Sequence, residues 1–511
     1  MTPSVMYAPP HVFDFDNCFA RDLEGLFVPW QPATVPAPRL LKLNDALAQK
    51  LGVDETALRG ELAAQIFSGN LLPLGATPIT QAYAGHQFGG YNPRLGDGRA
   101  LVLGEVIDRQ GQRRDIAFKG SGRTPFSRNG DGKAALGPVL REYLMGEALH
   151  ALGLPTTRAL AVVTTGETIL RETGPLPGAI LTRVAASHIR VGTFQFAAAQ
   201  DNPALLRRLA DHVIHRHYPD LLQADQPYLA LFKAISERQA ALIAGWMAVG
   251  FIHGVMNTDN MTLSGETIDY GPCAFMDRYN PATVFSSIDR YGRYAYGNQP
   301  MIAQWNLARL AEAMLPLFAE QTDAAVSRAM DVLNDFPHRY QIHWLACMRD
   351  KLGLSVEQSD DMADMTLAKD FLATLQGQGA DYTLAFRYLG EVAKSMGDPG
   401  GTAQALASLR GLYDDPALLE IWLPRWQQRI QDGRSVADRA QAMHAVNPLY
   451  IPRNHKVEEA LSAASNDFDM QPFERLLRLI QHPFDAQVDD QDYHLPMSKE
   501  AEACYKTYCG T

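Results

Sequence analysis

The sequence predicts an α+β fold in which a small β-rich part precedes a larger, mostly helical part. Two observations predict it. Between Tyr83 and about Val184, short apolar runs alternate with Gly-containing turns, as in a sheet built from hairpins. From about Thr193 onward, apolar residues recur every three or four positions in long stretches, which is typical of packed helices. With 511 residues and 46% hydrophobic content, the chain can bury two or three packed units.

Four segments are predicted along the chain. They are an N-terminal extension, a β-rich N-lobe, a helical C-lobe and an acidic C-terminal tail with Cys509, at residues 1–75, 76–192, 193–480 and 481–511. The extension mixes proline-rich loops with one helix, LNDALAQKLG, which Asn44 caps and Gly52 ends.

The apolar runs of the β-rich lobe follow in a clear order. ALVLGEVI and DIAF lie on either side of the turn DRQGQRR and predict a hairpin that ends at Lys119. The next run, PVLREYLMGEALHALG, has helical spacing, with Pro138 near its start and Gly153 at its end. RALAVVTT and AILTRVAA then predict two strands joined by the turn TGPLPG.

Composition excludes several classes of protein. The net charge of −11 and the pI near 5.7 argue against a nucleic-acid partner, because such binding depends on clustered Lys and Arg. No run of about 18 apolar residues is present, so no membrane partner is expected. The start of the chain lacks the basic and apolar regions of a leader. Five unevenly spaced cysteines predict neither a metal knuckle nor a disulfide framework. We expect a cytoplasmic protein.

The stretch GFIHGVMNTDNMTLSGETIDYG resembles a phosphotransferase loop with one carboxylate missing. Protein kinases often carry His-Gly-Asp, four residues and Asn, followed by a metal-binding Asp-x-Gly. Here Val255 occupies the place of the first carboxylate, and Asp259 is the only carboxylate in the loop that could replace it as general base. MTL and TID are expected to pair as short strands, so that Asn260 and Asp269 converge on one Mg²⁺.

An ion pair is predicted between the two parts of the β-rich lobe. Lys119 ends a strand and Glu142 lies in the helix that follows, as in the pair that holds a kinase lysine against nucleotide phosphates. By itself, Lys119 also fits an ordinary solvated charge. Together with the loop around Asp259, the order of the segments predicts a protein kinase-like bilobal fold.

Glycine-rich loops and two arginines complete the candidate site. Gly96 and Gly98 let backbone N–H groups approach phosphates, although an ordinary turn fits them equally well. Asp131 and Gly132, in SRNGDGKAALG, could meet a ribose or a base edge. Two further arginines suggest a polyphosphate pocket that would present the α-phosphate; they are Arg183 and Arg190. These residues alone do not exclude transfer of the γ-phosphoryl group.

The chain resembles the selenoprotein O family of kinase-like adenylyltransferases over nearly its full length. The strings that carry the resemblance are YAGHQFGGYNPRLGDGRA, FKGSGRTPFSRNGDGKAALGPVLREYLMGEA, HGVMNTDNM, DYGPCAFMD and NPLYIPRNHKVEEAL. The resemblance implies that ATP binds in an orientation flipped relative to ordinary kinases. It also implies transfer of AMP to Ser, Thr or Tyr hydroxyls of proteins, self-modification included, with release of pyrophosphate.

The resemblance assigns roles to individual residues. It implies Asp259 as the base and Asn260 and Asp269 as ligands of Mg²⁺, with Mn²⁺ as a substitute metal. For ATP it implies Gly96, Gly98 and Arg99 in GDGR, Lys119 in FKG, Asp131 and Gly132 in NGDGK, and also Arg183 and Arg190. It further implies redox control through Cys509, for which Cys273 is a candidate disulfide partner. Two alternatives stay open: a γ-phosphoryl-transferring kinase and a non-catalytic, redox-sensitive ATP-binding module.

Overall fold

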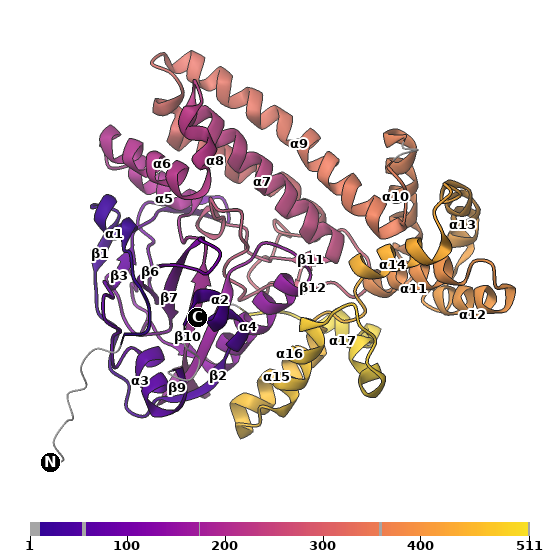
Figure 1. The fold of residues 1–511 in the computed structure, drawn as a ribbon, viewed down its shortest axis with the longest axis horizontal. Helices are drawn as coiled ribbons and strands as arrows, with labels where there is room; N and C mark the ends of the chain where they lie inside the picture. Colours follow the sequence, from indigo (N-terminus) through magenta and orange to yellow (C-terminus); the bar gives the residue numbers. More distant parts are fainter. Residues whose placement is uncertain (1–10, 54–57, 173, 357–359, 509–511) are drawn as a thin grey trace.

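The computed structural model describes residues 11–53, 58–172, 174–356 and 360–508. The chain is a mixed α+β protein in which an N-terminal antiparallel sheet is followed by a largely helical region (Figure 1). The prediction of this coarse order is confirmed. Cys509 lies outside the described residues, so its predicted redox role has no structural counterpart here.

The main sheet has the strand order β1-β3-β6-β7-β10-β9-β2, and the short β8 pairs with β10. Its strands are β1 (Phe27–Pro29), β2 (Arg39–Leu43), β3 (Ile79–Gln81), β6 (Ala100–Ile107), β7 (Arg113–Lys119), β8 (Ala134–Ala135), β9 (Arg158–Arg171) and β10 (Gly174–Ala185). Two small ribbons pair β4 (Gly85–Gln87) with β5 (Gly90–Asn92), and β11 (Phe251–Ile252) with β12 (Ala274–Phe275). The predicted β6–β7 hairpin is confirmed, with Ala100 opposite Lys119.

The turn predicted at TGPLPG is wrong. These residues belong largely to β10, and Pro175 and Pro177 pair with Leu170 and Thr168 of β9. The ladder shifts register between Pro177 and Ala179, which fits a residue that has no N–H to donate. The two strands are therefore longer than their apolar runs, and the prolines lie in their outer part.

Helices surround and extend the sheet. Those before Gly353 are α1 (Cys18–Asp22), α2 (Asp45–Leu51), α3 (Gly60–Ser68), α4 (Leu136–Ala151), α5 (Val191–Ala198), α6 (Pro203–His217), α7 (Pro227–Val249), α8 (Gln299–Phe318) and α9 (Thr322–Leu352). The later ones are α10 (Asp361–Leu375), α11 (Tyr382–Ser395), α12 (Pro399–Arg410), α13 (Ala417–Arg429), α14 (Val436–Val446), α15 (Asn454–Asp467), α16 (Gln471–Gln481) and α17 (Lys499–Cys504).

The predicted helix after Asn44 is confirmed. The side chain of Asn44 accepts a hydrogen bond from Leu47 N at 3.1 Å, which satisfies one free N–H of the first turn. Gly52 ends the helix with φ at +83°, in the left-handed region that glycine adopts without strain.

The sheet separates two apolar cores because side chains alternate along its strands. On β6, Leu101 and Leu103 face a core with α2 and α3, whereas Val102 faces the larger core shared with α4. Helix α4 also packs against α15 and α16, so it joins the sheet to the helical part. Within the described residues, no helix combines the length and apolar character needed to cross a bilayer.

The segment predicted as an acidic tail contacts the body of the protein. Arg475 and Arg478 of α16 pair with Asp490, and Arg278 pairs with Glu502 of α17. Further along, Thr507 donates to Pro272 O at 2.7 Å, next to the loop that carries Asp269.

Candidate functional site

A cavity of about 850 Å³ lies where the sheet meets the helical part. All but one of the predicted site residues line it: Gly96, Gly98, Arg99, Lys119, Asp131, Gly132, Arg183, Arg190, Asp259, Asn260 and Asp269. The exception, Glu142, lies behind the cavity wall and pairs with two residues that line it, Lys119 and Arg183. Residues scattered over more than 170 positions therefore converge on one space.

Lys119 and Glu142 form the predicted ion pair. Lys119 stands at the end of β7 and its Nζ donates to a carboxylate oxygen of Glu142, which projects from α4. The same Nζ donates to Asp269 Oδ1 at 2.9 Å. Both partners of the pair are buried, and the two carboxylates hold the lysine in a fixed position.

Two buried arginines meet the same carboxylate. Arg183 Nη1 donates to Asp269 Oδ1 at 2.9 Å and to Glu142 Oε1 at 3.2 Å. Arg190 Nη1 donates to Asp269 Oδ2 at 3.1 Å. Burial raises the pKa of Asp269, but the adjacent Lys119, Arg183 and Arg190 hold that pKa well below its ordinary value. Asp269 is therefore ionised at neutral pH.

Asp259 lies in a single 3₁₀ turn, Thr258–Asn260. Its Oδ2 accepts a hydrogen bond from Gln87 Nε2 at 3.1 Å, and its Oδ1 is buried without a partner among the described residues. Burial raises the pKa of Asp259 to about 6, although the charge of Arg190 opposes this. A carboxylate with such a pKa is suited to accept a proton near neutral pH.

The loop between Asn260 and Asp269 is not the predicted hairpin. Thr262 bridges to Arg190 and Thr267 bridges to Thr156, so each expected strand pairs with a distant segment. The loop still brings both ends to the cavity. Partners from other parts of the fold outcompeted the local pairing, which a short run of three residues per strand stabilises weakly.

Asn260 and Asp269 offer oxygen atoms for a hard cation. The amide Nδ2 of Asn260 donates to Val255 O at 3.0 Å, which leaves Oδ1 as its ligand atom. Asp269 supplies a carboxylate and adopts a left-handed φ of +64°. Because Mg²⁺ prefers one or two such oxygens plus phosphate oxygens and waters, the donor set fits this metal.

The glycines of the cavity wall are required by close packing. A Cβ on Gly96 would lie 2.3 Å from the Phe126 ring, and one on Gly132 would lie 2.1 Å from Gly122 O. Both also have positive φ. Beside Gly132, Asp131 pairs with Arg171 at 2.9 Å. The two loops can therefore pack this closely only because these positions carry no side chain.

Sequence reasoning missed several side chains of the cavity. Gln87 and Asn257 lie beside Asp259, whereas Tyr83 stacks under Arg190 at 4.6 Å from guanidinium carbon to ring centroid. Gln87 and Tyr83 belong to YAGHQFGGYNPRLGDGRA, a string in which only Gly96, Gly98 and Arg99 were assigned to the site from the sequence. No spacing rule pairs that string with a loop 172 residues later.

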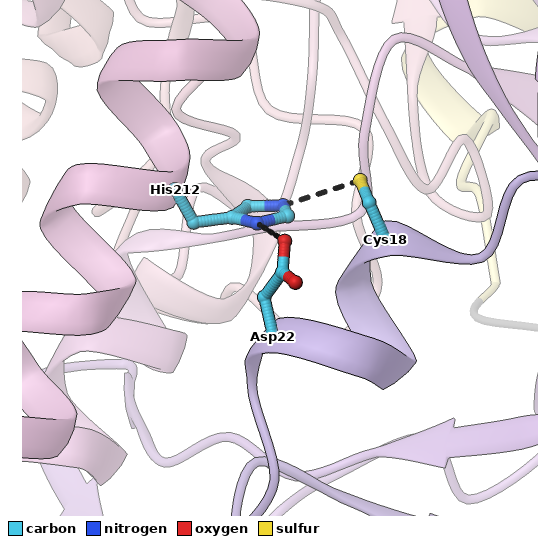
Figure 2. Close-up of side chains that lie close together, drawn as sticks. All are labelled: Cys18, Asp22 and His212. Carbon is cyan, nitrogen blue, oxygen red and sulfur yellow. Dashed lines mark hydrogen bonds and ion pairs between the residues drawn. The ribbon is translucent and has the colours of Figure 1, made fainter.

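A second cluster of reactive side chains lies outside the cavity (Figure 2). Cys18 Sγ and His212 Nε2 are 4.0 Å apart, and Asp22 Oδ2 lies 3.5 Å from His212 Nδ1. The thiol also donates to Glu105. Burial, with the charge of Glu105, raises the pKa of Cys18 to about 12. Because metals bind the thiolate, a metal bound here would have to displace the proton of Cys18.

Comparison with known proteins adds an independent finding. The family model described as protein adenylyltransferase SelO matches residues 12–481. A protein nucleotidyltransferase YdiU from Cereibacter sphaeroides strain KD131 is 58% identical over 499 residues, which cover 98% of this chain and 100% of the relative. A protein nucleotidyltransferase YdiU from Rhizobium etli strain CIAT 652 is 56% identical over 504 residues, with 98% of both chains covered.

Proposed function

The chain belongs to the SelO family of protein adenylyltransferases, and from this premise we propose that it transfers AMP from ATP to Ser, Thr or Tyr hydroxyls of proteins. One observation carries the proposal. Asp259, Asp269, Lys119 and the two arginines line a single cavity whose volume suits a nucleotide. A protein hydroxyl would act as the acceptor, and pyrophosphate would leave.

The charges around Asp269 support ATP as the donor. Lys119, Arg183 and Arg190 face the carboxylates of Asp269, Glu142 and Asp97. Among the described residues, the cavity lining as a whole carries seven Lys and Arg side chains against four carboxylates, so positive charge is in excess. Guanidinium groups hold phosphates bidentately. In this proposal the two arginines bind the outer phosphates, and Arg99, Gly96 and Gly98 line the wall beside the rest of the nucleotide.

Asp259 acts as the general base. As the acceptor oxygen attacks the α-phosphorus, its proton passes to a carboxylate oxygen of Asp259, and the bond to the bridging oxygen of the pyrophosphate breaks. Lys119, oriented by Glu142, offsets negative charge on the phosphates. Asn260 and Asp269 would hold Mg²⁺, which when bound neutralises phosphate oxygens.

The arrangement of segments supports a protein kinase-like bilobal fold. In that assignment residues 76–192 form the N-lobe and residues 193–480 the C-lobe, with extensions at both ends. The lysine at the end of β7, its glutamate on α4 and the loop that carries Asp259 follow the chain order known for kinases. The base lies at Asp259 instead of at the position of Val255, and this displacement distinguishes the proposed chemistry from that of a kinase.

The decisive experiment follows the label of ATP. The protein is incubated with Mg²⁺, a mixed protein extract and ATP labelled on either the α- or the γ-phosphate. We expect α-label on protein and release of pyrophosphate. Transfer of γ-label would instead indicate a kinase, and ATP binding without any transfer would indicate a non-catalytic module.

Asp259→Asn tests the base. We expect the rate of AMP transfer to fall by about two to four orders of magnitude, because an amide cannot accept the proton. ATP affinity, measured by calorimetry, should change little. Asp225→Asn, at an exposed position, is the matched control and should transfer AMP as the unchanged protein does. Equal transfer by both variants would contradict the assignment.

A further inference from the structure

The β4–β5 hairpin lies over the loop that carries the base. Phe88 N donates to Asn257 Oδ1 at 3.1 Å, and His86 N donates to Thr258 Oγ1 at 2.7 Å. Residues of the hairpin thus bind the two positions that precede Asp259. The hairpin is joined to this loop by directed hydrogen bonds, which fix one geometry between them.

Between these anchors, Gln87 meets the base itself. Its Nε2 donates to Asp259 Oδ2 at 3.1 Å. The other oxygen, Oδ1, faces Gly85, where an added Cβ would lie 2.8 Å from it, and is buried. A general base must come within about 2.6–3.2 Å of the donor oxygen. Only Oδ2 can come this close to a donor oxygen without movement of the hairpin, and Oδ2 already accepts the hydrogen bond from Gln87.

We propose that Gln87 is a positioning residue that holds Asp259 Oδ2 until the acceptor hydroxyl replaces it, and that it thereby suppresses attack by water. The inference rests on the adenylyl transfer proposed above. The acceptor O–H gives its proton to Oδ2, its oxygen bonds to the α-phosphorus, and the bond to the departing pyrophosphate breaks. With water in that place the products would be free AMP and pyrophosphate.

The energetics of exchange favour a protein acceptor over water. A water molecule that displaces the Gln87 amide breaks one hydrogen bond to Oδ2 and makes one, with little net gain. A protein segment also buries apolar surface, for which the cavity edge offers Phe88, 40% exposed, and Ile288, 47% exposed. Binding energy available only to the true substrate thus drives the exchange.

The test measures how turnover divides between transfer and hydrolysis. Released pyrophosphate and protein-bound AMP are quantified in the same reaction for the unchanged protein, Gln87→Ala and Gln87→Met. Methionine keeps the length of the side chain and removes the amide donor, so it covers the case in which alanine disturbs folding. Gln110→Ala, at an exposed turn, is the matched control, and thermal midpoints report folding.

We expect the ratio of pyrophosphate to bound AMP to rise severalfold in both Gln87 variants and to stay unchanged in Gln110→Ala. A purely structural role would lower both products together, so an unchanged ratio in the Gln87 variants would overturn the inference. Failure of the proposed function looks different, because the unchanged protein would then bind ATP yet attach no α-label to any protein.

Discussion

The cavity and the Cys18 cluster use the same kinds of side chain but balance charge in opposite ways. Among the described residues that line the cavity, seven Lys and Arg side chains stand against four carboxylates, and Asp269 by itself contacts Lys119, Arg183 and Arg190. Positive charge is therefore left for an anionic ligand. Such an excess, beside a hollow, is what phosphate binding requires.

Behind Cys18 the balance is reversed. Three guanidiniums, of Arg21, Arg113 and Arg216, pair with four carboxylates, those of Asp16, Asp22, Glu105 and Asp115. Each of these arginines already pairs with carboxylates of the protein, so none is left to bind a phosphate. The comparison teaches that buried charge marks a ligand site only where the protein itself leaves that charge uncompensated.

His188 connects the two regions. Arg183 Nε donates to His188 Nε2 at 3.2 Å, and the other ring nitrogen of His188 lies 2.8 Å from Asp115 Oδ2. Burial lowers the pKa of His188, although Asp115 opposes this, so the ring is neutral and donates from one side only. The following changes test whether the regions nevertheless serve separate purposes.

Arg216→Ala is expected to have the largest effect, on stability. It leaves Glu105 and Asp115 buried without their main counter-charge, and the free energy of unfolding should fall by about 3–5 kcal/mol. Urea denaturation measures this. Arg208→Ala, a partly exposed change on the same helix, should cost far less. Equal losses of unfolding free energy in the two variants would show that the buried network contributes no more to stability than Arg208 does.

Lys119→Met addresses the cavity. We expect kcat/KM for AMP transfer to fall by about 100-fold, because one positive charge of the cavity is lost, while Asp269 keeps two arginine partners. The free energy of unfolding should change much less in this variant than in Arg216→Ala. Lys233→Met, on the exposed side of α7, is the control, and a similar loss of activity there would contradict the assignment.

The pH dependence of unfolding probes His212. Burial, with the charge of Arg216, lowers the pKa of His212 to about 4, whereas an unfolded imidazole titrates near 6.5. Between these values the unfolded chain binds more protons, so stability falls as the pH falls through this window. The stability lost when the pH has fallen below both values is about 3 kcal/mol. His212→Gln should flatten the curve of unfolding free energy against pH, and an unchanged curve would refute the shift.

Cys18→Ser should have the smallest effect. A hydroxyl can donate to Glu105 as the thiol does, so the free energy of unfolding should change by less than about 1 kcal/mol. Metal content, measured by mass spectrometry, should be the same with and without the change. If zinc were instead bound in an amount equimolar with the protein and were lost in Cys18→Ser, this cluster would be a metal centre.

Local signals in the sequence predicted much of the fold. Asn44 and Gly52 bound α2 because a cap and a left-handed glycine act within one helical turn. The β6–β7 hairpin followed from two apolar runs and one polar turn. The predictions of a turn at TGPLPG and of a hairpin between MTL and TID, residues 261–269, were wrong because longer-range strand pairing overrode short local patterns.

By itself the sequence determined the order of a sheet followed by helices, the family, and the residue types gathered around Asp259. Only the tertiary structure decided which of them touch. Gln87 meets Asp259 across 172 positions, and Cys18 meets His212 across 194. Caps and periodicity depend on neighbours a few residues away, but a contact across such distances depends on how every intervening element packs.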